Sequence, residues 1–348
     1  MKFKIITLFI ILWTTQAHSQ EIVWNVGLES VFDNREYKSN FNYSQTIFGA
    51  VLSPEIGLRW NESHSIMVGA HVLSEFGSPV KDITVDPAFY YNYQHKYFNI
   101  SAGIVPFSQV IGTESRAFFN DSVRFFKRTI SGLLLQYVKG KNYAEFYCDW
   151  DGRQSETRRE KFTLYSSGRI TKNILFGRYE LSMHHHAGTT TGGGVTDNVW
   201  INPAIGVDLS HKAWLDSLTI SAGYLQSFQN DRTNVGKYVT PKGAEISICI
   251  EKWNFGVYNS LFLGDNMMPY NQRFGSSLYW GDSFYSTTNN VYDRVELYWQ
   301  PLKKKNFNLK VSSVHHFDGD NWSWQQFVKF CVKIDQNTFN KKKKITQM

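Results

Sequence analysis

The sequence contains no run of apolar residues long enough to cross a bilayer as a helix. Its longest such stretch, residues 5–13, spans nine positions and is interrupted only by Thr7. A membrane-spanning helix needs about 18 to 20 apolar residues. The sequence therefore excludes a helical inner-membrane protein.

Cysteine is also scarce, with three residues in a chain of 348. Cys148, Cys249 and Cys331 are too few and too widely spaced for the disulfide framework of a small secreted domain. We expect them to behave as small strand residues that do not covalently link the fold.

A strong charge imbalance is missing from the body of the chain. The formal net charge is +7, but Lys2 and Lys4 lie in the N-terminal leader and residues 341–344 form a run of lysines near the C-terminus. The central part is therefore close to neutral. We interpret the terminal lysines as a solvated tail and expect no nucleic-acid partner.

The N-terminus has the features of a signal peptide. Lys2 and Lys4 precede the apolar stretch, and residues 17–19 (Ala-His-Ser) offer small side chains at the two positions that signal peptidases read. The pattern predicts a signal peptide over residues 1–19 and an exported mature chain. No cysteine lies near the predicted cleavage site, which argues against a lipoprotein anchor.

Aromatic residues and short alternating segments are abundant. Phe, Tyr and Trp make up 16% of the chain, a content typical of barrels with aromatic girdles at two membrane interfaces. Alternation with a period of two predicts strands with one apolar and one polar face. In residues 143–150, the apolar face carries Ala144, Phe146, Cys148 and Trp150, and the other face carries Tyr143, Glu145, Tyr147 and Asp149.

About sixteen such segments follow one another, and the connections between them alternate between short and long. This rhythm is typical of an outer-membrane β-barrel, in which one rim has tight turns and the other has large loops. The mature length allows about 20 residues for each strand with its connection. Short connections include residues 61–63, 94–96 and 139–142, and long ones include residues 108–122, 187–197, 229–242 and 264–290.

A closed barrel also satisfies the backbone. Unpaired N–H and C=O groups in hydrocarbon cost several kcal/mol each, so a spanning sheet must have no free edge. We predict an all-β fold, a closed antiparallel transmembrane β-barrel of about 16 strands over residues 20–334, with short periplasmic turns and long extracellular loops. A basic C-terminal tail, residues 335–348, follows it. An open soluble sandwich, the alternative, would not need apolar residues on nearly every outer face.

With these features the chain resembles the porin-like outer-membrane barrels of Gram-negative bacteria. The resemblance rests on the leader, the strand number, the loop rhythm and stretches such as residues 52–60 (Leu-Ser-Pro-Glu-Ile-Gly-Leu-Arg-Trp). It implies an outer-membrane location, with the lipid bilayer, the barrel-assembly machinery and small hydrophilic solutes or ions as partners, and it leaves a homotrimer open. We expect no cofactor and no metal. The chain departs from the usual pattern of these barrels at its C-terminus, because the last predicted strand ends at Ile334 and not at an aromatic residue.

The porin resemblance further implies that the third long loop, residues 108–122, folds inward and narrows the channel. Opposite charges across such a constriction sort solutes by charge. The alternative is that the charged residues of this loop are ordinary solvent-exposed side chains. The pore residues that we expect are Glu114, Arg116, Asp121, Arg124, Arg128, Glu145, Asp149, Arg178, Glu180, Glu245, Arg294 and Lys329.

Receptor and enzyme functions are the alternatives to a channel. His184 and His186 would share a strand face, as a metal pair can, but no third ligand stands at a fixed spacing. A lipid hydrolase is the third function that we consider, after a channel and a surface receptor. It needs a Ser with a His base at the lipid-facing rim, and the sequence has no Gly-x-Ser-x-Gly element. We therefore expect a channel and not an enzyme. A surface receptor or adhesin would use residues of the longest loop, among them Met267, Met268, Tyr270, Tyr279 and Trp280.

Overall fold

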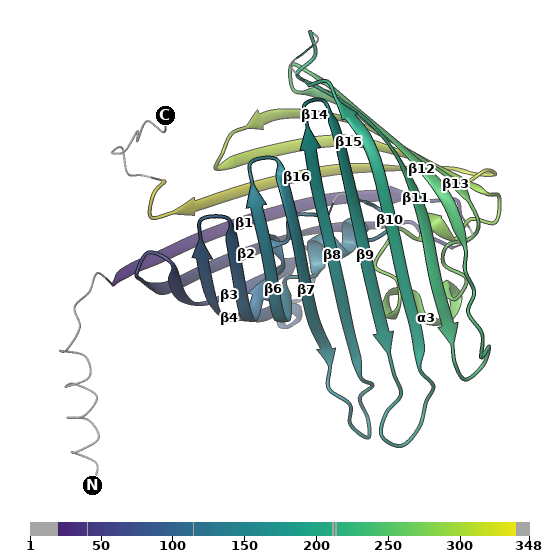
Figure 1. The fold of residues 1–348 in the computed structure, drawn as a ribbon, viewed down its shortest axis with the longest axis horizontal. Helices are drawn as coiled ribbons and strands as arrows, with labels where there is room; N and C mark the ends of the chain where they lie inside the picture. Colours follow the sequence, from purple (N-terminus) through teal and green to yellow (C-terminus); the bar gives the residue numbers. More distant parts are fainter. Residues whose placement is uncertain (1–19, 40, 114, 211, 213, 339–348) are drawn as a thin grey trace.

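The computed structural model describes residues 20–338, except residues 40, 114, 211 and 213. These residues form sixteen antiparallel strands in one sheet that closes on itself (Figure 1). Among the described residues, no helix has the length and apolar character needed to cross a membrane. The predicted fold class and strand number are confirmed.

Each strand pairs with its neighbours in sequence, and β1 pairs with β16 to close the ring. Short helical segments lie in the connections. The strands are β1 Glu21–Glu36, β2 Gln45–Trp60, β3 His64–Glu75, β4 Thr84–His95, β5 Phe98–Pro106, β6 Thr129–Lys139, β7 Asn142–Gly152, β8 Lys161–Lys172, β9 Leu175–His186, β10 Thr196–Asp208, β11 Ser217–Asp231, β12 Lys242–Lys252, β13 Phe255–Gly264, β14 Val291–Lys303, β15 Phe307–Phe317 and β16 Trp322–Asp335. The helices are α2 Asp121–Phe126 and α3 Asn271–Phe274, with 3-10 turns η1 Val80–Asp82, η2 Phe107–Gln109, η3 Gly275–Ser277 and η4 Ser283–Ser286.

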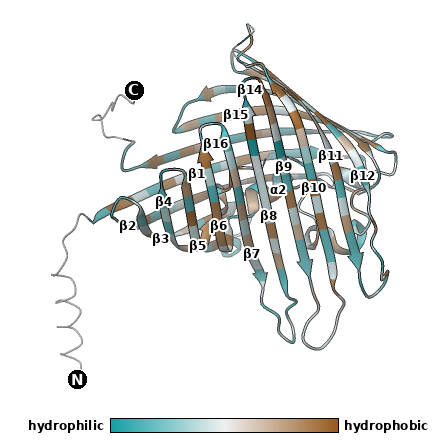
Figure 2. Cartoon of the chain, in the orientation of Figure 1, coloured by the Kyte–Doolittle hydropathy of each residue, from teal (hydrophilic) through white to brown (hydrophobic). Residues whose placement is uncertain are grey.

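The period of two separates the lumen from the outer wall. In β7, Glu145 and Asp149 are buried, whereas Trp150 is 47% exposed on the outside. Figure 2 shows hydrophobic and hydrophilic residues following one another along single strands all round the barrel. The outer face presents apolar side chains to lipid, and the lumen receives the polar ones.

The two ends of the barrel differ in their connections. We call the end with the tight turns the turn end and the opposite end the loop end. At the turn end, Asn61 and Glu62 join β2 to β3 with positive φ angles of 50° and 57°, as a tight hairpin requires. At the loop end lie loop L3, residues 107–128, and loop L7, residues 265–290, which are the longest connections.

One strand starts later than the alternation predicts. Alternation in the sequence predicts the sixth strand over residues 124–138, but β6 begins at Thr129 because α2 precedes it. The side chain of Asn120 caps this helix by accepting a hydrogen bond from the Val123 N–H at 2.7 Å. Arg124 and Arg128 therefore belong to L3 and not to a strand.

Candidate functional site

Loops L3 and L7 both fold into the barrel and meet in its lumen (Figure 1). The Asn120 N–H donates to the Trp280 carbonyl at 2.8 Å, and the Asp282 N–H donates to the Arg116 carbonyl at 2.7 Å. Their buried side chains form a core with aromatic residues of the strands, which we call the plug. Its members include Phe107, Phe118, Phe119, Tyr147, Tyr165, Trp200, Phe262, Met267, Met268, Leu278, Tyr279, Trp280, Phe284, Tyr285 and Tyr292.

The plug fills the lumen at its level. Between L3, L7 and the wall near Trp200, the remaining hollow has a volume of about 10 Å³, which is room for about one water molecule. Met267, Met268, Tyr279 and Trp280, which a receptor would need on its surface, are at most 6% exposed. The third loop folds inward, as the porin resemblance implies, and a second loop packs against it in the lumen.

Beneath the plug lies a group of paired charges. Arg116 and Asp121, both of L3, form an ion pair, and Arg294 of β14 lies 3.7 Å from Asp121 and 3.1 Å from Glu296. Burial would raise the pKa of Asp121, but the guanidinium groups of Arg116 and Arg294 hold it far below its ordinary value. The structure thus brings Arg116, Asp121 and Arg294 together, as a compact ion-pair network under the plug.

Other predicted pore residues anchor L3 to the wall. Glu145 accepts hydrogen bonds from the N–H groups of Ile111 at 2.9 Å and Gly112 at 2.6 Å. Asp149 accepts from the Ser131 N–H at 2.8 Å and pairs with Lys127 of L3. These carboxylates face the lumen as expected, but they hold a loop and do not line an open constriction.

Glu245 anchors L7 in the same way. Its carboxylate accepts hydrogen bonds from Tyr285 at 2.6 Å, Asn202 at 3.0 Å and Ser260 at 3.1 Å. Of the remaining predicted residues, Glu114 lies outside the described residues. Arg124 lies in α2 of L3. The other four make ion-pair contacts in the lumen, namely Arg178 with Glu180 at 3.9 Å, Arg128 with Glu29 at 3.8 Å and Lys329 with Glu29 at 3.0 Å.

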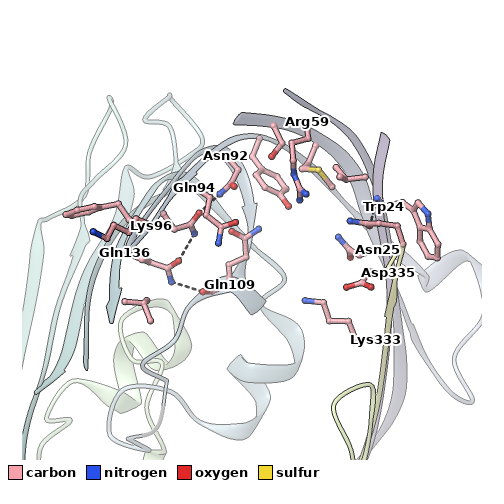
Figure 3. Close-up of a pocket in the computed structure, with 18 of the residues that line it drawn as sticks. Trp24, Asn25, Arg59, Asn92, Gln94, Lys96, Gln109, Gln136, Lys333 and Asp335 are labelled. Atoms are coloured by element: carbon pink, nitrogen blue, oxygen red, sulfur yellow. Dashed lines mark hydrogen bonds between the residues drawn. The ribbon is translucent and has the colours of Figure 1, made fainter. Parts of the chain in front are cut away.

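Below L3 the lumen is hollow and open toward the turn end. A hollow of about 660 Å³ lies at the turn end, and a second of about 480 Å³ reaches the underside of L3. Figure 3 shows Gln94, Gln109 and Gln136 on one side of the first hollow and Asn25, Asp335 and Lys333 on the other. The two hollows share the lining residues Asn25, Tyr90, Gln109 and Lys333 and therefore adjoin, and we call them together the vestibule.

A Ser–His pair lies on the outer wall near the loop end. Alternation along β15 turns Ser313 and His315 outward, while His316 is 1% exposed and packs against Phe284 in the plug. The Ser313 Oγ lies 3.0 Å from the His315 Nε2. The sequence analysis did not single out this pair, although a Ser-x-His spacing on an outward strand face was a visible signal.

Next to Ser313 the outer wall is hollowed and apolar. The hollow has a volume of about 960 Å³ and crosses from β12 to β1. Polar side chains continue from Ser313 along its loop end, with the Gln326 Oε1 accepting from Asn34 at 3.4 Å and the Asn34 Oδ1 accepting from Thr46 at 2.8 Å. The hollow is lined by Phe32, Trp214, Ile250, Phe255, Val257, Leu297, Trp299, Val311, Trp324 and Val328.

The three consecutive histidines of β9 point to opposite faces of the barrel wall. His184 and His186 face the lumen, as their spacing predicts, and His185 faces outward. His185 stacks on Phe162 with centroids 4.7 Å apart, and its Nδ1 lies 3.2 Å from the Asp197 Oδ1. In the described part of the chain, no group of three or more His, Cys, Asp or Glu side chains is placed to hold a metal ion.

Among solved structures, this chain is similar in fold to porin-like outer-membrane barrels. OmpT of Vibrio cholerae in a trimer form matches with a TM-score of 0.56 and 8% identity, covering 91% of this chain and 100% of that one. OpdL of Pseudomonas aeruginosa matches at 0.53 and 9%, covering 91% and 99%. OprB of Pseudomonas putida matches at 0.52 and 9%, covering 94% and 96%. The protein is an outer-membrane β-barrel, and the predicted location is confirmed.

The family comparison gives a different functional class. The model of the lipid A 3'-O-deacylase-type family matches residues 14–343, nearly the whole chain. The chain belongs to this family. The comparison with curated proteins gives no match. The prediction that the protein is not an enzyme is therefore wrong. Alternation and loop rhythm indicate a barrel and carry no information about catalysis.

The contact between L3 and L7 can be tested at Gly281. A Cβ atom at this position would overlap the carbonyl oxygen of Ala117 in L3. We therefore expect Gly281→Ala to loosen L7 and to speed proteolytic cleavage within residues 265–290 of the folded barrel. Gly192→Ala, where a Cβ meets open space, is the matched control and should leave cleavage unchanged. Equal cleavage of both variants and wild type would contradict the docking of L7 on L3.

Proposed function

We propose that this protein is an outer-membrane esterase that removes an acyl chain from lipid A. The family match over residues 14–343 carries the proposal, because it spans the whole barrel. An esterase that acts on a lipid needs a nucleophile near the ester and an apolar surface for the acyl chain. The outer wall at β15 carries a Ser–His pair beside an apolar hollow.

Ser313 is the proposed nucleophile and His315 its base. As the Ser313 Oγ attacks the acyl carbonyl carbon, the His315 Nε2 accepts the hydroxyl proton and then returns it to the sugar oxygen as the ester bond breaks. Water next attacks the acyl-serine, His315 again accepts and returns a proton, and the fatty acid leaves with Ser313 restored. Water is the co-reactant that balances the reaction.

The depth of the pair in the bilayer suits an ester linkage. Ser313 precedes the loop end of β15 by four residues, from Phe317. At about 3.3 Å per residue and a tilt of about 40°, it lies roughly 10 Å inside the strand end. The apolar hollow then extends from Ser313 toward the turn end, along the direction in which an acyl chain enters the membrane.

Gln326 is the proposed donor to the carbonyl oxygen in the transition state. It stands directly opposite Ser313 in the pairing of β15 with β16, and its Oε1 accepts from Asn34, which leaves its amide N–H₂ group to donate. The Nδ1 of His315 is buried and has no hydrogen-bond partner in the described part of the chain. We therefore propose a Ser–His dyad, without the acid of a triad.

The enzyme proposal is tested with purified, folded barrel and lipid A in mixed micelles. Mass spectrometry would follow the release of fatty acid. We expect Ser313→Ala and His315→Asn each to reduce the release rate by at least about 100-fold, because each removes a group that acts in the chemical step. The thermal unfolding of both variants should match wild type, since both side chains lie on the outer face.

Two matched variants separate this site from its neighbours. Ser312→Ala changes the adjacent serine, which faces the lumen and bonds Glu296, and His185→Asn changes the other outward histidine of the loop end. Both should keep most of the activity. Full activity in Ser313→Ala would remove the dyad but leave an esterase, whereas the absence of release by folded wild type would overturn the esterase itself.

Solute passage under control of the plug is the second function that we propose. The vestibule supports entry of water and small polar solutes from the turn end, and the plug stands between it and the loop end. We propose that the barrel conducts small hydrophilic solutes or ions only when L7 leaves the lumen. The likeness in fold to OpdL and OmpT supports a barrel scaffold, and the low sequence identity leaves the solute open.

Planar-bilayer recording tests this second function. We expect the wild type to give no stepwise conductance at rest, and a variant with residues 267–285 replaced by a short Gly-Ser linker to give discrete steps. The physical reason is that these residues supply the L7 half of the plug. Silence of the linker variant, shown to be folded and inserted, would rule out the channel.

Three further expectations stay proposals. The trimer form of OmpT supports a homotrimer, which a sizing measurement in detergent would test. The leader supports cleavage after Ser19, which N-terminal sequencing of the mature protein would test. Insertion by the barrel-assembly machinery is the ordinary route for this class of protein.

A further inference from the structure

We propose that the wall of the vestibule carries a second hydrolytic site, with Ser53 as nucleophile and His71 as its base, for small water-soluble carboxylic esters that bear a negative charge. The site lies in the lumen beneath L3, so its substrate enters from the aqueous phase at the turn end. It differs from the proposed dyad on the outer wall in its residues, in its strands and in its class of substrate.

The pairing of the strands places five residues in one row across the lumen face of the wall. His71 of β3 stands directly opposite Asp86 of β4. Gly27 of β1 stands opposite Ser53 of β2 on one side and opposite Lys333 of β16 on the other. A hydrogen bond joins the two halves of the row, because the Ser53 Oγ lies 2.8 Å from the His71 Nδ1. From β4 to β16, the row therefore contains an acid, a base, a nucleophile, a glycine and a cation.

Ser53 and His71 are arranged as a nucleophile and its base. Both line the inner hollow of the vestibule, which has a volume of about 480 Å³. His71 is 4% exposed, so the wall around it fixes its ring, whereas Ser53 is only partly buried. A hydroxyl that is hydrogen-bonded to an imidazole nitrogen can transfer its proton to that nitrogen as it attacks a carbonyl carbon.

Gly27 leaves room for an acyl group next to Ser53. Neighbouring strands of a sheet lie about 4.8 Å apart, so the position of Gly27 separates the serine from Lys333 by the width of one strand. A Cβ atom added at Gly27 would lie 3.7 Å from the Ser53 Cβ, which is an ordinary contact distance. A larger side chain there would occupy the space beside the serine, and glycine leaves this space to a substrate.

Lys333 supplies positive charge on the other side of this space. Its side chain extends from β16 into the vestibule and lines both hollows (Figure 3). An ammonium group at this position would stabilise the oxyanion that forms when Ser53 adds to an ester carbonyl.

The charge of the inner hollow favours an anionic substrate. Five cationic side chains and two carboxylates line it. Lys127 is paired with Asp149, which leaves four cations against the two carboxylates. A hollow lined by an excess of one charge concentrates solutes of the opposite charge. The cations are Arg124, Lys127, Arg128, Lys329 and Lys333, and the carboxylates are Glu29 and Glu55.

Hydrolysis at Ser53 needs only the ester and water. The Ser53 Oγ adds to the acyl carbonyl carbon while the His71 Nδ1 accepts the hydroxyl proton, and His71 returns this proton to the alcohol oxygen as the ester bond breaks. Water then attacks the acyl-serine with His71 again as base, and a carboxylic acid leaves with Ser53 restored. Asp86 is a positioning residue, because its carboxylate beside His71 would stabilise the imidazolium between the two proton transfers.

The site is tested with the full-length folded barrel and two esters of similar size, the anionic 4-acetoxybenzoate and its neutral methyl ester. Liquid chromatography follows the release of the phenol. We expect kcat/KM for the anionic ester to exceed that for the neutral one by at least about tenfold. Ser53→Ala and His71→Asn should each lower kcat by at least about 100-fold. Gly27→Val should lower kcat/KM by at least about tenfold, because the added side chain fills the substrate space.

Two further variants test the positioning residue and the specificity of the serine. Asp86→Asn should lower kcat and leave KM unchanged, and Asp86→Glu should recover part of the rate, which a merely structural role would not explain. Ser65→Ala is the matched control, because Ser65 lines the outer hollow and lies outside the row. It should keep the rates of wild type.

Covalent labelling identifies the reactive serine without any substitution. Wild-type barrel is treated with diisopropyl fluorophosphate, and mass spectrometry of its peptides locates the label, which we expect on Ser53. Absence of ester hydrolysis by folded wild type, wild-type rates in Ser53→Ala, or a label on Ser313 without one on Ser53 would overturn the vestibule site. A label on Ser53 in a barrel that releases no fatty acid from lipid A would support this site and count against the outer-wall esterase, so the two proposals fail separately.

Discussion

Closure of the sheet between β1 and β16 is the constraint on which the rest of the molecule depends. A free edge in hydrocarbon would leave a row of unpaired backbone groups, and the pairing from Asn25 with Asp335 to Glu36 with Trp324 removes it. Closure also creates two separate environments, because a strand residue must face either lipid or lumen. Every functional feature described above follows from which of these two faces a side chain occupies.

The lumen shows what happens to polar residues once they are turned inward. Buried carboxylates are stable only when donors surround them, and Glu145, Asp149 and Glu245 find donors in the loops, at Gly112, Lys127 and Tyr285. The same bonds draw L3 and L7 into the barrel, where their aromatic side chains escape water. A row of charges that would line a pore in an open barrel thus becomes the attachment of a plug.

Period-two alternation was enough to predict the strands, their faces and the closed barrel. It could not predict the plug, because this depends on contacts such as that between the Asn120 side chain and the Gly281 carbonyl, 161 residues apart. The predicted start of β6 was wrong for a local reason. The side chain of Asn120 caps α2, so a segment whose alternation also fits a strand forms a helix. The Ser313–His315 pair could have been found from the same alternation, had the two histidines of β15 been assigned to opposite faces. The family membership was beyond pattern reasoning, because no motif in the chain states it.

β15 carries the proposed dyad on its outer face and contacts the plug on its inner face. Its outward residues Ser313 and His315 alternate with Ser312 and His316, and His316 stacks on Phe284 of L7 with centroids 4.4 Å apart. The wall behind the dyad is therefore supported by the plug. A nucleophile and base on a single strand keep their distance only if that strand does not bend, and packing of L7 against its inner face supplies this rigidity. In this view the plug fills part of the lumen and also holds the outer wall in the shape that the proposed dyad requires.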